Sequence, residues 1–419
     1  MFQTKRYRKH VQVIIFWLAI ISIVILSGCS SMPLHKAMYN GNLEDAQQLI
    51  LKQQDIDKPD NLGFRPLHIA ADKGQLEIFK ALVAQGVTID PKSNNGWTPL
   101  MFAVQRDYRT MVEILVEKGA DVNARNSNDA TPIMIASYHG RESIFDYLIG
   151  KGASYDVKDK NDVTPLMMAS EMDHLSIAKK LIGLGANVNA KNKRAASALM
   201  FALNKGNEQV AELLVQSGSD VNAKDDVGWT PLMYAAKSGM SNLVQKLIDN
   251  GADIHARSKA GASPVFIAVF HDHIAIATKL IDLGAQPVSV DSHVNDTFAT
   301  AKLYKLTAEI REKGGNKHDA ADHYQTAASF FEKASAGFKE KAGEMKKNFW
   351  KATFANALMA GIAAGGATYQ AQQTGVGIQQ YQQVGTGRFT QMEKTFLAKA
   401  EQCHSLAVEC SSLSQKLRQ

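Results

Sequence analysis

Apolar residues along most of the chain recur with helical spacing, in short segments that come in pairs. In one such pair, Leu100 and Ala103 mark the first segment, and Val112, Ile114 and Leu115 mark the second. Each set falls on one side of a helix with 3.6 residues per turn. Because one helix pair cannot bury its apolar side alone, we expect successive pairs to pack against each other.

Two short motifs repeat over this region at a constant step of 33 residues. The first is built around Pro-Leu, and it predicts a helix that begins with a hydroxyl N-cap followed by a proline. Its copies are Met32–His35, Arg65–His68, Thr98–Met101, Thr131–Met134, Thr164–Met167, Ser197–Met200, Thr230–Met233 and Ser263–Phe266. The second motif follows the second helix and begins with a glycine suited to a left-handed helix end. It occurs at Gly119–Ala124, Gly185–Ala190 and Gly251–Ala256, and Gly152 fills the same glycine position in another copy.

This pattern resembles the ankyrin repeat family over roughly residues 32–290. The resemblance implies an all-α fold, an ankyrin-repeat solenoid of about eight copies, each a helix–turn–helix plus a β-turn. We therefore expect an ankyrin domain at residues 29–290 and a helical C-terminal region at residues 291–419. The resemblance also implies a non-enzymatic scaffold that binds a protein partner.

Some copies depart from the family pattern. Copy one has Met32 in the threonine position and Gln53 in the glycine position, so we interpret it as an N-terminal cap. Copy six has Ala198 in place of proline and Ala195 in place of the turn glycine, and we expect it to be the least stable internal copy. Five copies carry methionine where the family usually has histidine, and we interpret these methionines as core packing.

The N-terminus has the pattern of a secretory signal. Four cations, and no acid, precede the apolar run Val11–Leu26, whose 16 residues would measure about 24 Å as a helix, short of the roughly 30 Å of a bilayer core. The four are Lys5, Arg6, Arg8 and Lys9. Leu26–Cys29 then resembles the lipobox of bacterial lipoproteins, which implies a signal peptide at residues 1–28 and lipid attachment at Cys29. The alternative is an uncleaved N-terminal anchor with an incidental cysteine.

These features predict a lipid-anchored protein on the periplasmic side of a bacterial cell envelope. Ser30, in place of aspartate, favours the outer membrane, whereas an uncleaved anchor would hold the chain in the inner membrane. Removal of the signal would leave 43 of the 47 basic residues against 41 acidic ones, a formal charge of +2. The basic character is therefore mainly a feature of the signal, and we expect no nucleic-acid partner.

The 33-residue step ends near Asp291, and a helical pattern of a different kind follows. Two helices are predicted in Leu303–Lys333, around Gly314-Gly315; they resemble one tetratricopeptide-type hairpin, or alternatively they cap the last ankyrin copy. The apolar run Ala357–Ala367 has 11 residues and is too short to span a bilayer. We expect a Gln/Gly-rich connection at Gln370–Gly387 and a last helix at Arg388–Leu417.

Two cysteines lie on that last helix, seven residues apart. Cys403 and Cys410 would be about 10 Å apart along the axis, too far to bridge each other. We expect free thiols, and the alternative is a homodimer cross-linked through Cys403 or Cys410.

The sequence contains no recognisable catalytic, phosphate-binding or zinc-binding motif, so we expect no enzymatic activity, cofactor or metal. His271-Asp272-His273 is the one cluster that suggests a metal. It falls on the turn between the two helices of copy eight, where His273 fills the same position as His174 in copy five. We interpret these histidines as structural.

The candidate partner-binding residues lie before and within the first helices. Trp97 and Trp229 precede the N-cap in copies three and seven, and Phe64 fills the same position in copy two. Aromatic side chains on a partly wet surface are frequent binding anchors, although each indole could instead pack over its own turn. Between the tryptophans we expect polar loop tips and two first-helix residues to contribute, and these are Ser127, Asn128, Lys160, Asn161, Lys193, Arg194, Tyr138 and His139. We predict a protein partner that lies along copies three to seven.

Three other functions remain compatible with parts of the sequence. The chain could be an envelope inhibitor or immunity protein that neutralises a toxic enzyme, an effector directed into a host cell, or an enzyme with an active site in the tail. The lipobox-like segment argues against the effector, and the absence of a nucleophile–base or metal pattern argues against the enzyme.

Overall fold

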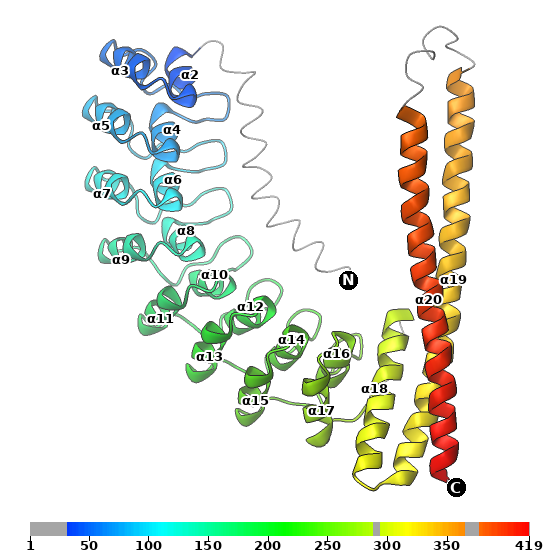
Figure 1. Ribbon diagram of the computed structural model, residues 1–419. Helices are drawn as coiled ribbons and strands as arrows, with labels where there is room; N and C mark the ends of the chain where they lie inside the picture. Colours follow the sequence, from blue (N-terminus) through cyan, green and yellow to red (C-terminus); the bar gives the residue numbers. More distant parts are fainter. Residues whose placement is uncertain (1–31, 288–293, 365–376, 419) are drawn as a thin grey trace. The chain divides into compact units, whose positions relative to one another are not determined.

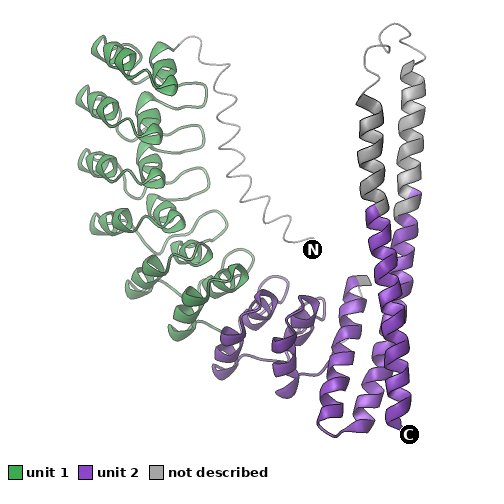
Figure 2. Ribbon diagram, viewed as in Figure 1, with its two compact units in different colours: residues 1–220 green, residues 221–419 purple. Residues whose placement is uncertain are grey.

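The computed structural model describes residues 32–287, 294–364 and 377–418; the predicted signal and Cys29 lie outside the described residues. The chain divides into two compact units, residues 1–220 and residues 221–419 (Figure 2). The division falls between copies six and seven of the 33-residue pattern. Copies seven and eight therefore group with the C-terminal helices in this division. The predicted domain boundary at residue 290 lies outside the described residues and stays a prediction.

Unit 1 consists of six helix pairs that stack in chain order (Figure 1). In every pair a first helix of seven or eight residues is followed by a second helix of nine. The pairs are α2 (Pro33–Asn40) and α3 (Leu43–Leu51), α4 (Pro66–Lys73) and α5 (Leu76–Ala84), α6 (Pro99–Arg106) and α7 (Arg109–Glu117), α8 (Pro132–His139) and α9 (Glu142–Gly150), α10 (Pro165–Glu171) and α11 (Leu175–Gly183), and α12 (Ala198–Lys205) and α13 (Glu208–Gln216). No β-strand occurs among the residues that the structure describes.

The first helices begin at the predicted position, but hydroxyl capping is less general than predicted. Thr98 and Thr164 accept hydrogen bonds from the backbone N–H groups of Met101 and Met167, at 3.4 and 3.3 Å. The buried hydroxyls of Thr131 and Ser197 have no hydrogen-bond partner among the described residues, so the prediction is wrong for these helices. Their starts are set by the extended backbone at the N-cap, with φ of −108° and −96°.

Left-handed backbone occurs at two places in each repeat. Gly119 and Gly152 end second helices with φ of 92° and 87°, as predicted, and Gln53 takes this position in copy one at φ 53°. In the loop before the first helix, Gly96 has φ 72°, whereas Ala195 of copy six has φ 55°. Ala195 therefore holds a conformation that costs a residue with a Cβ roughly 1–2 kcal/mol and glycine almost nothing.

The methionines of the Pro-Leu motif fill the interior, as predicted. Met101, Met134, Met167 and Met200 are at most 1 % exposed in unit 1. Copies one and two carry His35 and His68 at this position. Each histidine donates a hydrogen bond from Nε2 to a backbone carbonyl of the following loop, at 3.1 and 3.0 Å.

Side-chain amides join neighbouring copies at the ends of the second helices. The Asn123 amide nitrogen donates to the carbonyl of Gly152 at 3.1 Å, and its Oδ1 accepts the N–H of Ser154 at 2.8 Å. Asn189, two copies further along the chain, makes the same two bonds, to Gly218 and Asp220. Each such residue therefore satisfies backbone groups of the next copy that its own helices leave open.

Unit 2 begins with two more helix pairs and continues with three longer helices (Figure 1). The helices are α14 (Pro231–Ser238), α15 (Ser241–Asp249), α16 (Pro264–Phe270), α17 (Ile274–Asp282), α18 (Val294–Lys313), α19 (Lys317–Ala364) and α20 (Gly377–Arg418). α18 packs against α16 and α17, and Lys302 of α18 forms an ion pair with Asp272. α18 therefore covers the last ankyrin copy, as a terminal cap must.

α19 and α20 form an antiparallel pair whose contact follows a seven-residue repeat. Small buried residues occupy one position of this repeat on both helices: Ala321, Ala328, Ser335 and Ala342 on α19, and Ala400, Ala407 and Ser414 on α20. The Ser335 hydroxyl donates to the backbone carbonyl of Ala400 at 2.9 Å. A side chain can reach the partner helix's backbone in this way only where small residues let the two helices approach closely.

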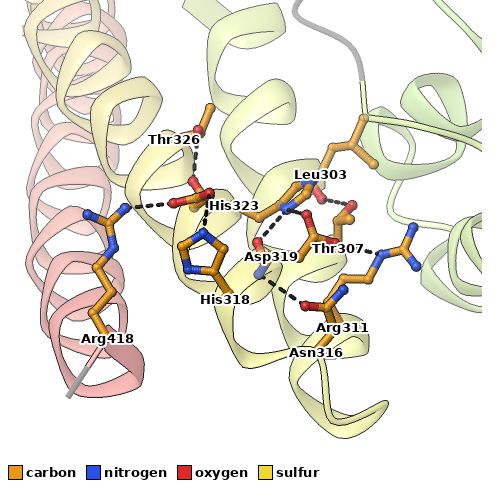
Figure 3. A network of polar contacts seen from close by, with 10 residues as sticks. Leu303, Thr307, Arg311, Asn316, His318, Asp319, His323, Thr326 and Arg418 are labelled. Carbon is orange, nitrogen blue, oxygen red and sulfur yellow. Dashed lines mark hydrogen bonds and ion pairs between the residues drawn. The ribbon is translucent and has the colours of Figure 1, made fainter.

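A polar network fixes the turn between α18 and α19 (Figure 3). Asp319 lies 3.3 Å from both Arg311 and His323, and the N–H of Asp319 donates to Oδ1 of Asn316. The last residue of α20, Arg418, donates to Asp322 at 2.7 Å. These contacts join all three helices of the C-terminal bundle at one end.

The structure corrects two details of the predicted C-terminal region. α20 begins at Gly377, earlier than the predicted start at Arg388, so part of the expected connection at residues 370–387 is helical. α18 and α19 do form the predicted hairpin at Gly314-Gly315, but α19 has 48 residues and α20 adds a third helix, so the hairpin is part of a larger bundle. Within the described ranges, no helix is both long enough and apolar enough to cross a membrane.

Cys403 and Cys410 are free thiols, as expected, and both are 0 % exposed in the bundle core. Burial raises the pKa of each thiol to about 11. A disulfide between two folded chains through either residue would require the bundle to open, which argues against the alternative of a cross-linked dimer.

Candidate protein-binding surface

The predicted loop-tip residues lie together on the loops that precede the first helices of copies four, five and six. All six side chains are exposed: Ser127, Asn128, Lys160, Asn161, Lys193 and Arg194. The loops are joined by backbone hydrogen bonds, in which Lys160 donates to Asn128 and Lys193 to Asn161, each at 2.9 Å. The tips therefore form one continuous polar surface in unit 1.

Each loop is also held internally by its first residue. Oδ1 of Asn126 accepts the N–H groups of Asn128 and Ala130, at 2.9 and 3.0 Å. Asp159 and Asn192 make the same pair of bonds in the next two loops. Because the loops already have a fixed shape, they lose little conformational entropy when a partner binds.

An aromatic cluster lies beside the loops of copies two and three. The ring of Phe102 is 5.6 Å from that of Phe64 and 5.0 Å from that of Trp97. Phe64 and Trp97 are half-buried, whereas Phe102 is 9 % exposed. Trp97 therefore packs on the first helix of its own copy, as the packing alternative anticipated, and still presents part of its ring to solvent.

Sequence reasoning did not single out Phe102. The signal was present, because an aromatic residue follows each of the two tryptophans by five positions, Phe102 after Trp97 and Tyr234 after Trp229. A residue five positions after the tryptophan lies on the first helix of the same copy, where its ring contacts the indole, at 5.0 Å in copy three and 5.1 Å in copy seven.

The buried ring of His68 also belongs to this cluster, 5.7 Å from that of Phe64 and 6.1 Å from that of Phe102, and it carries no charge. Its Nδ1 accepts the N–H of Arg65 at 3.0 Å, and its Nε2 donates to the carbonyl of Trp97 at 3.0 Å. Burial lowers the pKa of His68 to about 4. The histidine thus acts as a neutral hydrogen-bonding link between copies two and three.

Tyr138 and His139 lie at the end of α8, half-buried, with ring centroids 5.0 Å apart. Burial, with help from the cations Arg141 and Arg106, lowers the pKa of His139 to about 4. Both residues are therefore uncharged at neutral pH.

Charged residues at or just after the ends of three first helices of unit 1 are paired with charges of neighbouring copies. The pairs are Arg106–Asp72 (2.7 Å), Arg141–Asp107 (3.6 Å) and Lys205–Glu171 (3.1 Å). Exposed pairs of this kind add little stability, but they leave the surface around the aromatic residues close to neutral.

In unit 2, Trp229 packs on Tyr234 of its own copy at 5.1 Å. The Tyr234 hydroxyl donates to Asp225 at 2.8 Å, and the Lys237 ammonium group lies 6.0 Å from the centre of the indole. Burial lowers the pKa of Lys237. Trp229 thus has a local packing like that of Trp97 but a charged neighbour.

The histidine cluster of copy eight occupies the predicted turn between α16 and α17. Nε2 of His273 donates to the carbonyl of Lys237 at 3.0 Å, and Nε2 of His174 makes the equivalent bond to Tyr138 at 3.1 Å. Both histidine rings lie close to a left-handed glycine of the preceding copy, Gly239 and Gly140. These contacts give the histidines the predicted structural role, and the described residues contain no group of three or more potential metal ligands.

The helix pairs, their 33-residue step and the loops between them define a helical repeat protein. A family model described as ankyrin repeats matches residues 34–126, 123–192, 178–258 and 199–291, which together cover more than half of the chain. The chain belongs to the ankyrin repeat family, whose members generally act as scaffolds for protein–protein interaction. No curated protein matches the chain.

Proposed function

We propose that this protein is a non-enzymatic scaffold that holds a protein partner on the loop tips and first helices of unit 1. A lipid on Cys29 anchors the scaffold to the bacterial cell envelope, on the periplasmic side and in the outer membrane.

The observation that carries the binding proposal is the composition of one continuous surface. Trp97 is a half-buried aromatic side chain, and the carbonyl of Asn95 in its loop accepts the backbone N–H of Ser127 in the next loop, which carries exposed polar tips such as Asn128. Tyr138 is a second half-buried aromatic side chain, at the end of α8. Aromatic anchors surrounded by polar residues are typical of protein-binding surfaces. The loops are already ordered, so binding would cost little further conformational entropy.

The anchoring proposal is supported by the sequence before the first helix. A basic segment, an apolar run and Leu26–Cys29 occur in the order that bacterial lipoprotein signals require. α2 begins at Pro33, four positions after Cys29, so a lipid there would hold copy one close to the membrane surface. Stable attachment would need two or more acyl chains.

Capture of a partner from detergent-solubilised envelope tests the scaffold. The bait is the full chain, compared with the double variant Trp97→Ala/Tyr138→Ala and with Lys179→Ala, a control on the second helix α11. We expect a protein that the wild type and the control retain and the double variant loses, while the melting temperatures of control and double variant stay above the capture temperature. Equal capture by all three baits would contradict the proposed surface, and no specific capture by any of them would contradict the scaffold.

A further inference from the structure

Phe64 and Trp97 occupy the same position in adjacent copies, 33 residues apart. Both rings are half-buried, and Phe102 lies between them, 5.6 Å from the Phe64 ring and 5.0 Å from the Trp97 ring. Neighbouring copies pack at the usual helix separation of about 8–10 Å. We name Phe64, Trp97 and Phe102 the aromatic shelf. Phe64 and Trp97 are two partly exposed rings about one repeat apart, and the more buried ring of Phe102 lies between them.

A hydrogen-bond donor and a neutral setting accompany these rings. The indole N–H of Trp97 has no acceptor among the residues that the structure describes. Arg65, which follows Phe64 in the chain, is paired with Asp57 at 3.1 Å, and Oδ1 of Asp60 accepts the backbone N–H groups of Leu62 and Phe64 at 2.8 Å. By charge complementarity, the matching occupant is an uncharged segment that brings its own hydrogen-bond acceptors.

We propose that the aromatic shelf binds a proline-containing, uncharged segment of the protein partner in the polyproline II conformation. This inference rests on the proposed scaffold function and names the chemistry of its partner. A polyproline II helix has three residues per turn and rises about 9.3 Å per turn, which matches the separation of adjacent copies. Rings of the segment at positions i and i+3 would therefore lie on Phe64 and Trp97.

The remaining groups of the shelf fit the same occupant. Polyproline II backbone makes no internal hydrogen bonds, so its carbonyl groups are free to accept the Trp97 indole N–H. Aromatic-lined surfaces are the common recognition mode for such segments, because the preformed helix loses little entropy on binding. The basic tips Lys160, Lys193 and Arg194 would favour an acidic segment instead, but they lie on copies five and six, away from the shelf.

Trp229 provides an internal control for the shelf. It packs on Tyr234 as Trp97 packs on Phe102, but the residue 33 positions before it is Ala196, and the Lys237 ammonium group lies 6.0 Å from its ring centre. Trp229 thus has a charged neighbour, and no aromatic residue stands 33 positions before it in the sequence, so we expect no polyproline binding there.

The test uses the full chain and three end-capped, labelled ten-residue peptides: oligoproline, a glycine–serine peptide and oligoglutamate. Fluorescence anisotropy should show saturable binding of oligoproline alone. Phe64→Ala and Trp97→Ala should each weaken it at least about tenfold, which is ~1.4 kcal/mol, Trp97→Phe should weaken it less, and Trp229→Ala should leave it unchanged. The melting temperature of each variant establishes that it is folded.

A second measurement uses the protein without substitutions, so that misfolding of a variant cannot affect the result. The chain contains four tryptophans, and in 5-fluorotryptophan-labelled protein the fluorine signal of Trp97 should shift with oligoproline while that of Trp229 stays in place. No binding of oligoproline, preference for oligoglutamate, or equal effects of Trp97→Ala and Trp229→Ala would overturn the inference. Because the envelope capture identifies a partner of any chemistry, the scaffold would stand if capture succeeds and oligoproline fails.

Discussion

Oδ2 of Asp90 accepts a hydrogen bond from the backbone N–H of Asp121 at 3.3 Å, in the position where three later copies have Asn123, Asn189 and Asn222. One repeat on, Asn123 accepts the equivalent N–H and also donates to the carbonyl of Gly152. A carboxylate cannot make that second bond, and Oδ1 of Asp90 is buried without a partner. Copy three therefore carries a weaker version of a bond that the neighbouring copy makes in full.

Asp90→Asn is expected to stabilise the protein at neutral pH. Burial raises the folded-state pKa of Asp90. Ionisation of this carboxylate therefore lowers the free energy of unfolding as pH rises through that pKa, and the loss is fully present at neutral pH. The amide removes this cost and adds a donor, worth about 0.5–1.5 kcal/mol. Thermal melts should show a higher Tm at pH 7 and a smaller advantage near pH 4.

Asn123→Asp is the matched control for this prediction and should lower the Tm at pH 7. An unchanged or lower Tm for Asp90→Asn at pH 7 would show that the ionised carboxylate is not a burden at this position.

Ala195→Gly is expected to stabilise copy six. Ala195 has φ 55°, where glycine is free of the strain that a Cβ imposes, and the expected gain is about 0.5–1 kcal/mol after the entropy cost of glycine. Hydrogen exchange should find the lowest internal protection of the wild type near residues 193–206, and higher protection there in the variant.

The control lies at the same position of copy three. Gly96→Ala should destabilise, because its backbone has φ 72° and a Cβ there would come within 2.7 Å of the backbone nitrogen of Ser127. Uniform protection across copies two to seven of the wild type would refute the assignment of copy six as the weakest internal copy.

Cys29 is expected to be the lipidated first residue of the mature protein. Mass spectrometry of the N-terminal peptide from membranes should find a chain that starts at Cys29 with added acyl mass, and Cys29→Ser should block processing. Ser30→Cys, which leaves Cys29 in place, is the control and should be processed normally. An intact chain from Met1 with unmodified Cys29 would rule out the anchor.

Ala400→Leu is expected to disrupt the contact between α19 and α20. Ala400 is 0 % exposed, and its carbonyl accepts the Ser335 hydroxyl at 2.9 Å, so a larger side chain must push the helices apart. Overpacking of this kind costs typically about 1–3 kcal/mol. Hydrogen exchange should rise in residues 317–344 and 391–418, while Ala398→Leu, at an exposed position of α20, should have no such effect.

The 33-residue step was sufficient to predict the helix pairs, because the proline and glycine positions that define it are backbone requirements. The lack of hydroxyl capping at Thr131 and Ser197 could not be predicted, since capping depends on a side-chain position that the backbone does not dictate. The same limit applies to Phe102, whose contacts with Phe64 join two copies.

The C-terminal bundle was harder to predict for a different reason. Its helices meet partly through small residues, as at Ser335 and Ala400, and partly through aromatic rings, as at Phe338 and Phe396. Because alanine and serine are only weakly hydrophobic, about half of the seven-residue repeat is faint in a hydropathy pattern that depends on large apolar side chains. The Gln- and Gly-rich composition before residue 388 suggested a connection, but α20 already begins at Gly377.

The two thiols at the centre of this bundle make its breathing measurable. Cys403 and Cys410 sit one heptad apart and have no access to solvent while α19 and α20 stay together. A thiol-specific reagent can therefore react only during transient separation of the helices, so the alkylation rate of the intact protein reports how often the bundle opens. If Cys29 is acylated, these are the chain's remaining cysteines, and that rate can be read in the membrane-bound protein without introducing a label.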